Sequence, residues 1–506
     1  MAEQKKVLLK VTNLKQYFPL KQKGLYVKAN DGIDVDIYEG ETLGLVGESG
    51  CGKSTFGRTL LELYKQTDGR TMYYGRTLDE MAPKYVRDTI KNFPKLRERL
   101  KKLEAKREAA EKAFENAEPD KLAVLHEEMV HSQRAADAAF LNLVNVLGGF
   151  ITVEDTAPVQ EAFMEAEKLS VRLSKASMKR LPAESKLLDC EYLAENKGGS
   201  QSNIDSAKAK LDAIDKEIED IKAQLKVAHA KIDELRAKYD GDEEFAKYEA
   251  YRDDGIDLAR LTTNEMRHLR SDLQFIFQDP YSSLNPRMTV GQIISEGMVA
   301  HNYYSRRSPR LQSHIIQVME MCGLAPYFIH RYSHQFSGGQ RQRIGIARAL
   351  STDPKFVVCD EAVSALDVSI QSQIINLLQD LKEQKHLTYL FITHDLSVVK
   401  YISDRIGVMY LGNMVELADS QELFDRPMHP YTEALLSAIP TTNADDSREL
   451  VILEGDIPSP VNPPKGCKFH TRCKYCTEEC SKITPPLVEV RPNHFVACHH
   501  MLHTED

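Results

Sequence analysis

The residues that most directly predict chemistry are the nine from Gly47 to Thr55, GESGCGKST, which fit the pattern G-x-x-x-x-G-K-[ST]. An apolar run precedes them and helix-forming residues follow, which is the context that a phosphate-binding loop requires. Its glycines let backbone N–H groups converge on phosphate oxygens, and the helix N-terminus adds positive potential. We expect Lys53 to contact the β- and γ-phosphates of a nucleotide and Ser54 to bind Mg²⁺. The expected nucleotide-binding residues of this loop are Gly47, Ser49, Gly50, Gly52, Lys53, Ser54 and Thr55.

Two carboxylates follow another apolar run, Phe356–Cys359. Asp360, at the end of the expected strand, can hold Mg²⁺, and Glu361 can orient and deprotonate an attacking water. About one helix length earlier, Ser337-Gly-Gly339 opens a helical segment and forms a second anion-binding N-terminus. Two glycine-rich sites on opposite faces of one chain cannot hold the same phosphate. The sequence therefore predicts a dimer with ATP between the subunits.

Composition limits the class of protein. The 506 residues carry a net charge of −9, so no basic excess is available to hold nucleic acid, and we expect no nucleic-acid partner. No apolar run reaches the length of about 18 residues that a membrane span needs. The first residues lack the apolar stretch of a signal peptide, so we expect a cytoplasmic protein with reduced thiols.

A charge-rich block, residues 79–260, interrupts segments that alternate between strand-like and helix-like patterns. Within it, apolar residues recur at steps of three and four from Ile204 to Tyr239, as in a coiled coil, over a helix about 50 Å long. A weaker stretch runs from Leu96 to Ala117, and Pro119 ends it. We expect the two stretches to pair antiparallel as an arm, with Gly148-Gly149 and Gly198-Gly199 at its tip. A solvated helical bundle without activity is the simpler interpretation of such a block.

Five of the nine cysteines lie close together at the C-terminal end. Reduced, clustered cysteines usually bind metal, and four thiolates suit either tetrahedral Zn²⁺ or an iron–sulfur cluster. Nearby histidines could replace one thiolate if the metal is zinc. Because this tail lies far in sequence from the phosphate loop, we expect its role to be structural. The five cysteines are Cys467, Cys473, Cys476, Cys480 and Cys498.

Taken together, these motifs resemble those of ATP-binding-cassette (ABC) ATPases. The phosphate loop, the Ser-Gly-Gly-Gln signature, the Asp-Glu strand end, Ser364–Asp367 and Thr393–Asp395 occur in the family's order. The resemblance implies an α/β fold: a RecA-like core with an antiparallel β subdomain and a helical signature subdomain. To this fold the chain adds an inserted antiparallel helical or coiled-coil arm and a small Cys-rich C-terminal extension.

The resemblance also implies further roles. Gln278 would touch Mg²⁺ and the attacking water, and His394 would contact the γ-phosphate. Phe18 would stack on adenine, with Tyr17 as the alternative. The residues expected to serve the partner subunit's ATP, or to cross the dimer interface, are Ser337, Gly338, Gly339, Gln340 and Asp367.

Longer segments narrow the resemblance to the F-type ATPase subunit of oligopeptide and dipeptide importers. They are QDPYSSLNP from Gln278, HDLSVV from His394, HPYT from His429, Ala434–Pro440, and the tail from Gly455 to Cys473. This resemblance implies a [4Fe–4S] cluster on Cys467, Cys473, Cys480 and Cys498, with Cys476 as an additional candidate and zinc as the alternative. It also implies a second ABC ATPase subunit, two transmembrane permeases and an extracytoplasmic peptide-binding protein. The chain would then sit peripherally on the cytoplasmic face of the cell membrane.

We therefore expect four parts. Residues 1–78 and 261–440 form the ATPase domain, residues 79–260 form the arm, and residues 441–506 form the C-terminal extension. Three other interpretations compete with peptide import: import of nickel or heme, a coiled-coil ABC ATPase of DNA repair or chromosome maintenance, and a soluble translation-type ABC protein. The DNA-associated class has much longer coils, and the translation type usually needs two cassettes in one chain, where this chain has one.

Overall fold

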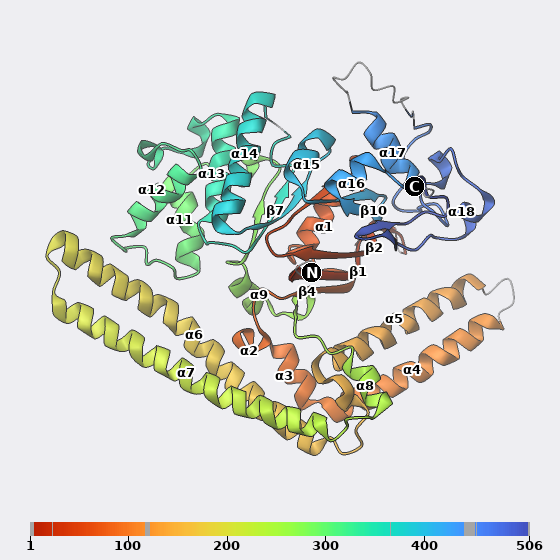
Figure 1. The fold of residues 1–506 in the computed structure, drawn as a ribbon, viewed down its shortest axis with the longest axis horizontal. Helices are drawn as coiled ribbons and strands as arrows, with labels where there is room; N and C mark the ends of the chain where they lie inside the picture. The colour runs from red at the N-terminus through yellow and green to blue at the C-terminus, as the bar shows by residue number, and fades with distance from the viewer. Residues whose placement is uncertain are drawn as a thin grey trace. The chain divides into compact units, whose positions relative to one another are not determined.

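A computed structural model describes residues 5–22, 24–116, 122–364, 366–439, 451 and 453–503 (Figure 1). The chain folds into two compact units. The sheet unit comprises Met1–Gly75, Asp257–Ala259 and Met266–Asp506, and the helical unit comprises Arg76–Ile256 and Arg260–Glu265. In the described residues, no helix is both long and apolar enough to span a bilayer.

The core of the sheet unit is an eight-stranded sheet in the order β11-β12-β10-β9-β3-β8-β7-β6. The strands from β9 to β6 are parallel, and β10, β12 and β11 continue the sheet antiparallel. All residues of β3, β7 and β8 are buried, as expected for parallel strands covered on both faces. The strands are β3 (Thr42–Val46), β6 (Leu273–Ile276), β7 (Phe356–Asp360), β8 (Thr388–Ile392), β9 (Arg405–Tyr410), β10 (Asn413–Asp419), β11 (Val488–Arg491) and β12 (His494–Val496).

A second, four-stranded sheet has the order β2-β1-β4-β5, and its long strands β1 and β2 are antiparallel. This arrangement agrees with the expected antiparallel subdomain beside a mixed α/β core. The strands are β1 (Val7–Pro19), β2 (Tyr26–Tyr38), β4 (Asp68–Tyr73) and β5 (Ile256–Asp257).

Helices cover the large sheet, and one group of them, α11 to α13, packs together beside β6 (Figure 1). Their buried faces share one apolar core with β7 and β8. The helices of this unit are α1 (Lys53–Leu60), α10 (Pro280–Ser283), α11 (Val290–Ala300), α12 (Leu311–Met321), α13 (Gly338–Leu350), α14 (Val368–Lys385), α15 (Leu396–Ile402), α16 (Ser420–Asp425), α17 (Pro430–Ser437) and α18 (Glu478–Lys482); α9 (Thr263–Leu269) spans the boundary between the units.

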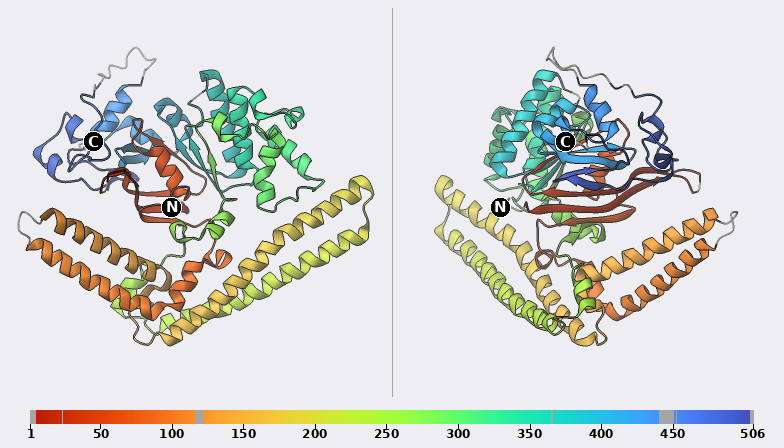
Figure 2. Two further views of the ribbon diagram at one scale, coloured as in Figure 1. Left: turned by 180° about the vertical axis from the view of Figure 1, so that it is seen from behind. Right: turned by 45° about the vertical axis from the view of Figure 1, so that its right-hand side comes forward.

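The helical unit contains two long helical hairpins (Figure 2). Helix α4 packs against α5, and α6 packs against α7. The heptad positions of α7 are buried as the periodicity predicts, from Ala207 through Ile221 to Ile232. The helices are α2 (Leu78–Met81), α3 (Lys84–Lys91), α4 (Phe93–Glu115), α5 (Leu122–Leu147), α6 (Ala157–Lys197), α7 (Gln201–Ala237) and α8 (Glu243–Glu249).

The expected pairing of the two heptad stretches is wrong. The seam of α7 is covered by α6, whose Leu173 and Ala176 share its apolar cluster, and α4 has its own partner in α5. The segment between the stretches is itself helical and supplies both partner helices. The two glycine pairs expected at the tip of the arm lie in different surroundings. Gly198 ends α6 with φ +70°, at the turn into α7, whereas Gly149 packs on Phe245 in a buried core. The expected end of the weaker stretch, at Ala117 and Pro119, lies outside the described residues.

Candidate nucleotide-binding site

The phosphate loop lies between β3 and α1, where the motif predicts it. Gly47 and Gly52 have φ values of +148° and +104°, and a Cβ would come within 2.2 Å of Met409 O and 2.1 Å of Ala29 O respectively. Only glycine fits both positions. Lys53 is buried, and its Nζ donates to Gly47 O at 2.7 Å and Glu48 O at 3.1 Å, so the loop wraps around this ammonium group.

Ser54 and Asp360 meet although 306 residues separate them. Ser54 Oγ donates to Asp360 Oδ1 at 2.6 Å, and the Asp360 carboxylate is fully buried. Burial raises the pKa of Asp360, while the bond from Ser54 and the charge of Arg58, 3.4 Å away, act in the opposite direction. Mg²⁺ prefers hard oxygen ligands and usually takes one or two of them from protein, leaving the others to phosphate and water. The hydroxyl–carboxylate pair therefore fits the expected ion.

The three expected catalytic residues, Gln278, Glu361 and His394, lie close together. Gln278 Nε2 donates to Glu361 Oε2 at 2.6 Å, and His394 Nδ1 lies 3.5 Å from Glu361 Oε1. They follow β6, β7 and β8, whose carboxyl ends share one edge of the sheet, the usual ligand edge of a parallel sheet. Glu361 has a left-handed φ of +46°, and its N–H donates to Ile392 O at 2.9 Å. Because the amide of Gln278 bonds Glu361, its place as a Mg²⁺ ligand stays a prediction.

The aromatic candidates differ in their surroundings. Tyr17 donates a short hydrogen bond from its hydroxyl to Asp31. Phe18 is half-buried, and its ring meets Tyr64 edge to face at 5.3 Å. A hydroxyl held within the protein leaves Tyr17 less free to stack on a base, so Phe18 remains the predicted adenine contact.

The signature residues lie at the start of α13, away from α1 and the phosphate loop (Figure 1). Ser337 caps the helix, and its reciprocal bonds with Gln340 form a capping box. Gly339 packs closely on Ile370, where a Cβ would come within 2.5 Å of the Ile370 side chain. Asp367 caps α14. Within one chain, the two glycine-rich sites are thus separate.

Four of the five tail cysteines line one small cavity: Cys467, Cys473, Cys480 and Cys498. Cys476 is exposed and does not line it. Burial raises the pKa of Cys473 to about 11 and that of Cys498 to about 12, so without a bound cation these thiols are neutral at physiological pH. Across the described chain, no three His, Cys, Asp or Glu side chains are close enough to hold a metal ion as they stand. The sulfur donor set suits a soft metal, but the side chains are not drawn together around one.

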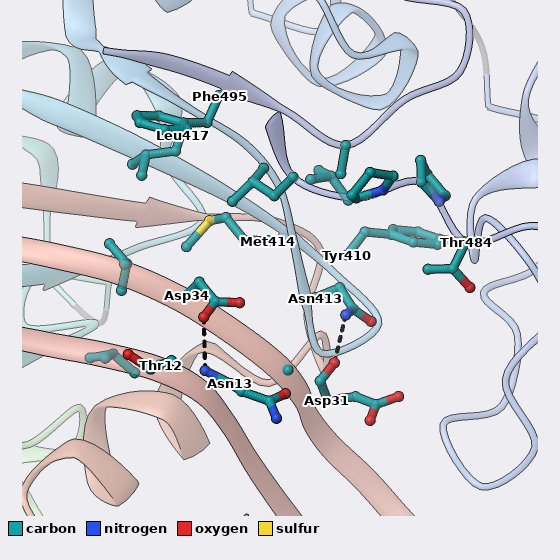
Figure 3. A pocket seen from close by; sticks show the side chains of 18 of the residues that line it. Thr12, Asn13, Asp31, Asp34, Tyr410, Asn413, Met414, Leu417, Thr484 and Phe495 are labelled. Atoms are coloured by element: carbon teal, nitrogen blue, oxygen red, sulfur yellow. Dashed lines mark hydrogen bonds between the residues drawn. The ribbon is translucent and has the colours of Figure 1, made fainter. Parts of the chain in front are cut away.

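Sequence reasoning missed two arginines near the nucleotide site and one larger cavity. Arg58 approaches Asp360, and Arg472, from the tail, forms an ion pair with Glu48 of the phosphate loop at 2.8 Å. In the sequence, only Glu48 pointed to such a contact, because it is a charged residue at a variable position of the phosphate-loop pattern. The larger cavity lies between the β1–β2 pair, β10 and the tail (Figure 3).

Comparison with known proteins agrees with these features. The family model "ABC transporter" matches residues 30–240 and 246–364, and the model "Oligopeptide/dipeptide transporter, C-terminal region" matches residues 415–480. The chain is 56% identical over 247 residues to the putative oligopeptide transport ATP-binding protein YkfD of Bacillus subtilis, covering 48% of this chain and 75% of the relative. The Bacillus subtilis protein AppF is 53% identical over 248 residues, with the same two coverages, and is named an oligopeptide transport ATP-binding protein. OppF of Salmonella typhimurium, which carries the same description, is 52% identical over 247 residues, covering 48% of this chain and 73% of the relative.

Among solved structures, the dimeric bacterial ABC transporter cassette MJ0796 aligns with 82% of this chain and 99% of its own, at 15% identity and a TM-score of 0.42. Assignment of the family rests on the family models and the sequence relatives. None of these matches favours the DNA-associated interpretation.

Proposed function

Because this chain belongs to the ABC transporter family of ATPases, we propose that it hydrolyses ATP to drive import of oligopeptides or dipeptides. The observation that carries the proposal is the convergence of Gln278 and His394 on Glu361, next to the Ser54–Asp360 pair. The match of residues 415–480 to a peptide-transporter region, and the names of the relatives, support the solute class.

Each residue of the site has its own role in the proposed reaction. Lys53 and the loop amides bind the phosphates, and Ser54 and Asp360 would hold Mg²⁺, which supplies charge neutralisation at the phosphates when bound. Glu361 accepts a proton from the attacking water, with Gln278 orienting its carboxylate. His394, 59% exposed, remains free to contact the γ-phosphate.

The separation of signature and phosphate loop within one chain supports a dimer. Ser337, Gly338, Gly339, Gln340 and Asp367 would serve ATP bound to a second, different ABC ATPase subunit. Two permease subunits and an extracytoplasmic peptide-binding protein would complete the importer. The chain would lie peripherally at the cytoplasmic face of the membrane.

The decisive experiment is reconstitution. Vesicles that contain the chain, its ATPase partner and the permeases, supplied with the peptide-binding protein, should take up radiolabelled peptide only with ATP, and the Glu361→Gln substitution should abolish uptake. Nickel and heme are the comparison solutes. Uptake of either one in place of peptides would overturn the solute class, and uptake at the normal rate with Glu361→Gln would overturn the catalytic assignment.

We also propose that residues 79–260 form an inserted helical, coiled-coil-like arm that contributes no ATP ligand. The apolar clusters of the helical unit support this division, because all their buried residues lie between Ile90 and Phe245. Replacing residues 79–255 with a short Gly/Ser linker, which keeps β5 in the sheet unit, should leave a folded protein that still binds ATP. Loss of ATP binding by a folded truncation would place the block in the catalytic machinery. We favour docking of a partner protein as the arm's role.

For the tail, we propose a [4Fe–4S] cluster on the four cysteines that line the small cavity. The same cavity is also lined by His429, His470, His499 and His500, so zinc with one histidine ligand stays the alternative.

Protein purified without oxygen should be brown and contain iron and acid-labile sulfide. Cys498→Ser should lose the iron, whereas Cys476→Ser, at the exposed cysteine outside the cavity, should keep it. One equivalent of zinc without iron would reject the cluster.

A further inference from the structure

The short tail segment from Cys467 to Cys473 carries two cations that reach the nucleotide-binding part of the sheet unit. Lys468 Nζ donates to Asp31 Oδ2 and to Leu411 O, both at 3.0 Å. Arg472 donates to both carboxylate oxygens of Glu48, at 2.8 Å and 3.1 Å. The Arg472 side chain is only 6% exposed and lies over the ring of Tyr410. A bidentate, largely buried guanidinium–carboxylate pair fixes geometry more tightly than a surface ion pair does.

Glu48 puts a carboxylate into the loop that is expected to bind phosphate. Its carbonyl oxygen accepts from Lys53, the residue expected to contact the nucleotide, at 3.1 Å. Its N–H donates to the Tyr431 hydroxyl at 2.9 Å. An unpaired charge here would repel the phosphates and compete for Lys53. The pairing with Arg472 neutralises Glu48 and holds its carboxylate against the tail.

The second cation supports the same loop from another side. Asp31 N donates to Gly412 O at 2.8 Å, and Asn413 Nδ2 donates to Asp31 O at 2.7 Å (Figure 3). Gly412 N in turn donates to Cys51 O, within the phosphate loop, at 2.9 Å. Lys468 therefore anchors the tail segment to the turn that holds the loop, while Arg472 contacts the loop directly.

We propose that Arg472 is a positioning residue for ATP: by pairing with Glu48, the C-terminal extension completes the phosphate loop. Arg472 acts through Glu48 and need not touch the nucleotide. ATP affinity thus depends on the tail segment between Cys467 and Cys473, which follows all other residues of the nucleotide site in the sequence.

The test is ATP binding by the full-length protein, measured by calorimetry with Mg²⁺ and compared among four variants. Arg472→Gln should weaken ATP affinity by about tenfold, within the usual range of couplings between sites. The matched control is Lys474→Gln, because Lys474 lies two residues further on and pairs with Glu433 of α17 at 3.2 Å instead. It should bind ATP within about twofold of wild type, as surface substitutions usually do.

Rescue separates electrostatic positioning from a general loss of structure. Glu48→Gln removes the charge that needs neutralising, so alone it should bind nearly as well as wild type. Added to Arg472→Gln, it should restore most of the lost affinity, because no unpaired carboxylate remains. Normal ATP affinity in Arg472→Gln, or no recovery in the double variant, would overturn the proposal. If Arg472→Gln fails to fold, Arg472→Met gives the same test: it keeps the apolar stem of the side chain but removes the charge that neutralises Glu48, and wild-type affinity in it would overturn the positioning role.

Discussion

The substitution Glu361→Gln tests the chemistry of the site most directly. It replaces one carboxylate oxygen by an amide group and leaves the shape of the side chain unchanged. The Glu361 N–H bond to Ile392 O and the left-handed φ of +46° involve only the backbone, so both persist. The phosphate loop, Ser54 and Asp360 are untouched. We therefore expect normal ATP affinity and an ATP-bound dimer that accumulates.

The magnitude follows from what the carboxylate does. Glu361 Oε2 is the acceptor for Gln278 at 2.6 Å, so the basic oxygen is held in a fixed direction. An amide can still bond Gln278 but cannot take a proton from water. Loss of a positioned general base lowers the rate by about 10²–10⁴-fold, which is a barrier increase of about 3–5 kcal/mol.

The assay is phosphate release by the two-subunit complex, because the isolated chain is expected to turn over slowly without its partner. ATP affinity and dimer formation are measured on the same preparation. Glu383→Gln, at an exposed glutamate of α14, is the matched control and should be normal. Turnover by Glu361→Gln within a few-fold of wild type would refute the assignment of Glu361 as the base.

Three further outcomes test other parts of the structure. Lys53→Ala should weaken ATP binding itself, because it removes the ammonium group around which the loop is wrapped; equilibrium binding decides this, and unchanged affinity would contradict it. Ile221→Ala, at a fully buried α7 position, should destabilise the helical unit by about 2–5 kcal/mol in calorimetry while ATP binding persists, whereas Val227→Ala, 59% exposed, should change little. The hydrogen bond to Asp79 raises the pKa of His229 above its ordinary value of 6.5. The pair therefore stabilises the folded state below pH 6.5, by under about 1 kcal/mol because both groups are partly exposed. This stabilisation is lost as the pH rises through the raised pKa. Denaturant melts of His229→Gln against wild type should therefore differ at pH 6 and converge at high pH; a difference that grows with pH would contradict this.

Local patterns were sufficient to predict which side chains lie together in the candidate nucleotide site. The phosphate loop carries its own geometry in its glycines, and parallel strands bring their carboxyl ends to one edge without further information. Gln278, Glu361 and His394 follow three adjacent strands of that kind, so they meet although the chain between them is long.

The helical unit shows why pattern alone was insufficient elsewhere. A heptad seam predicts that a face is buried, but it does not identify the helix that covers it. The α7 seam is regular and its positions are buried as expected, yet its partner is α6, whose own apolar spacing is less regular. Adjacent helices joined by a short turn pair most readily, and Gly198 provides that turn directly before α7.

The tail was expected to play a structural role because it lies far along the chain from the phosphate loop. The order of strands in the sheet brings the tail close to the phosphate loop in space. β12 pairs with β10, β10 with β9, and β9 with β3, the strand that leads directly into the phosphate loop. Arg472 thereby meets Glu48 although 424 residues separate them. A change that disturbs the cysteine-lined cavity would act one residue from Arg472, at Cys473, so stability and ATP affinity should fall together in such variants. A tail that was only structural would lower stability and leave the ATP affinity of the remaining folded protein unchanged, and this difference is measurable in one preparation of Cys473→Ser.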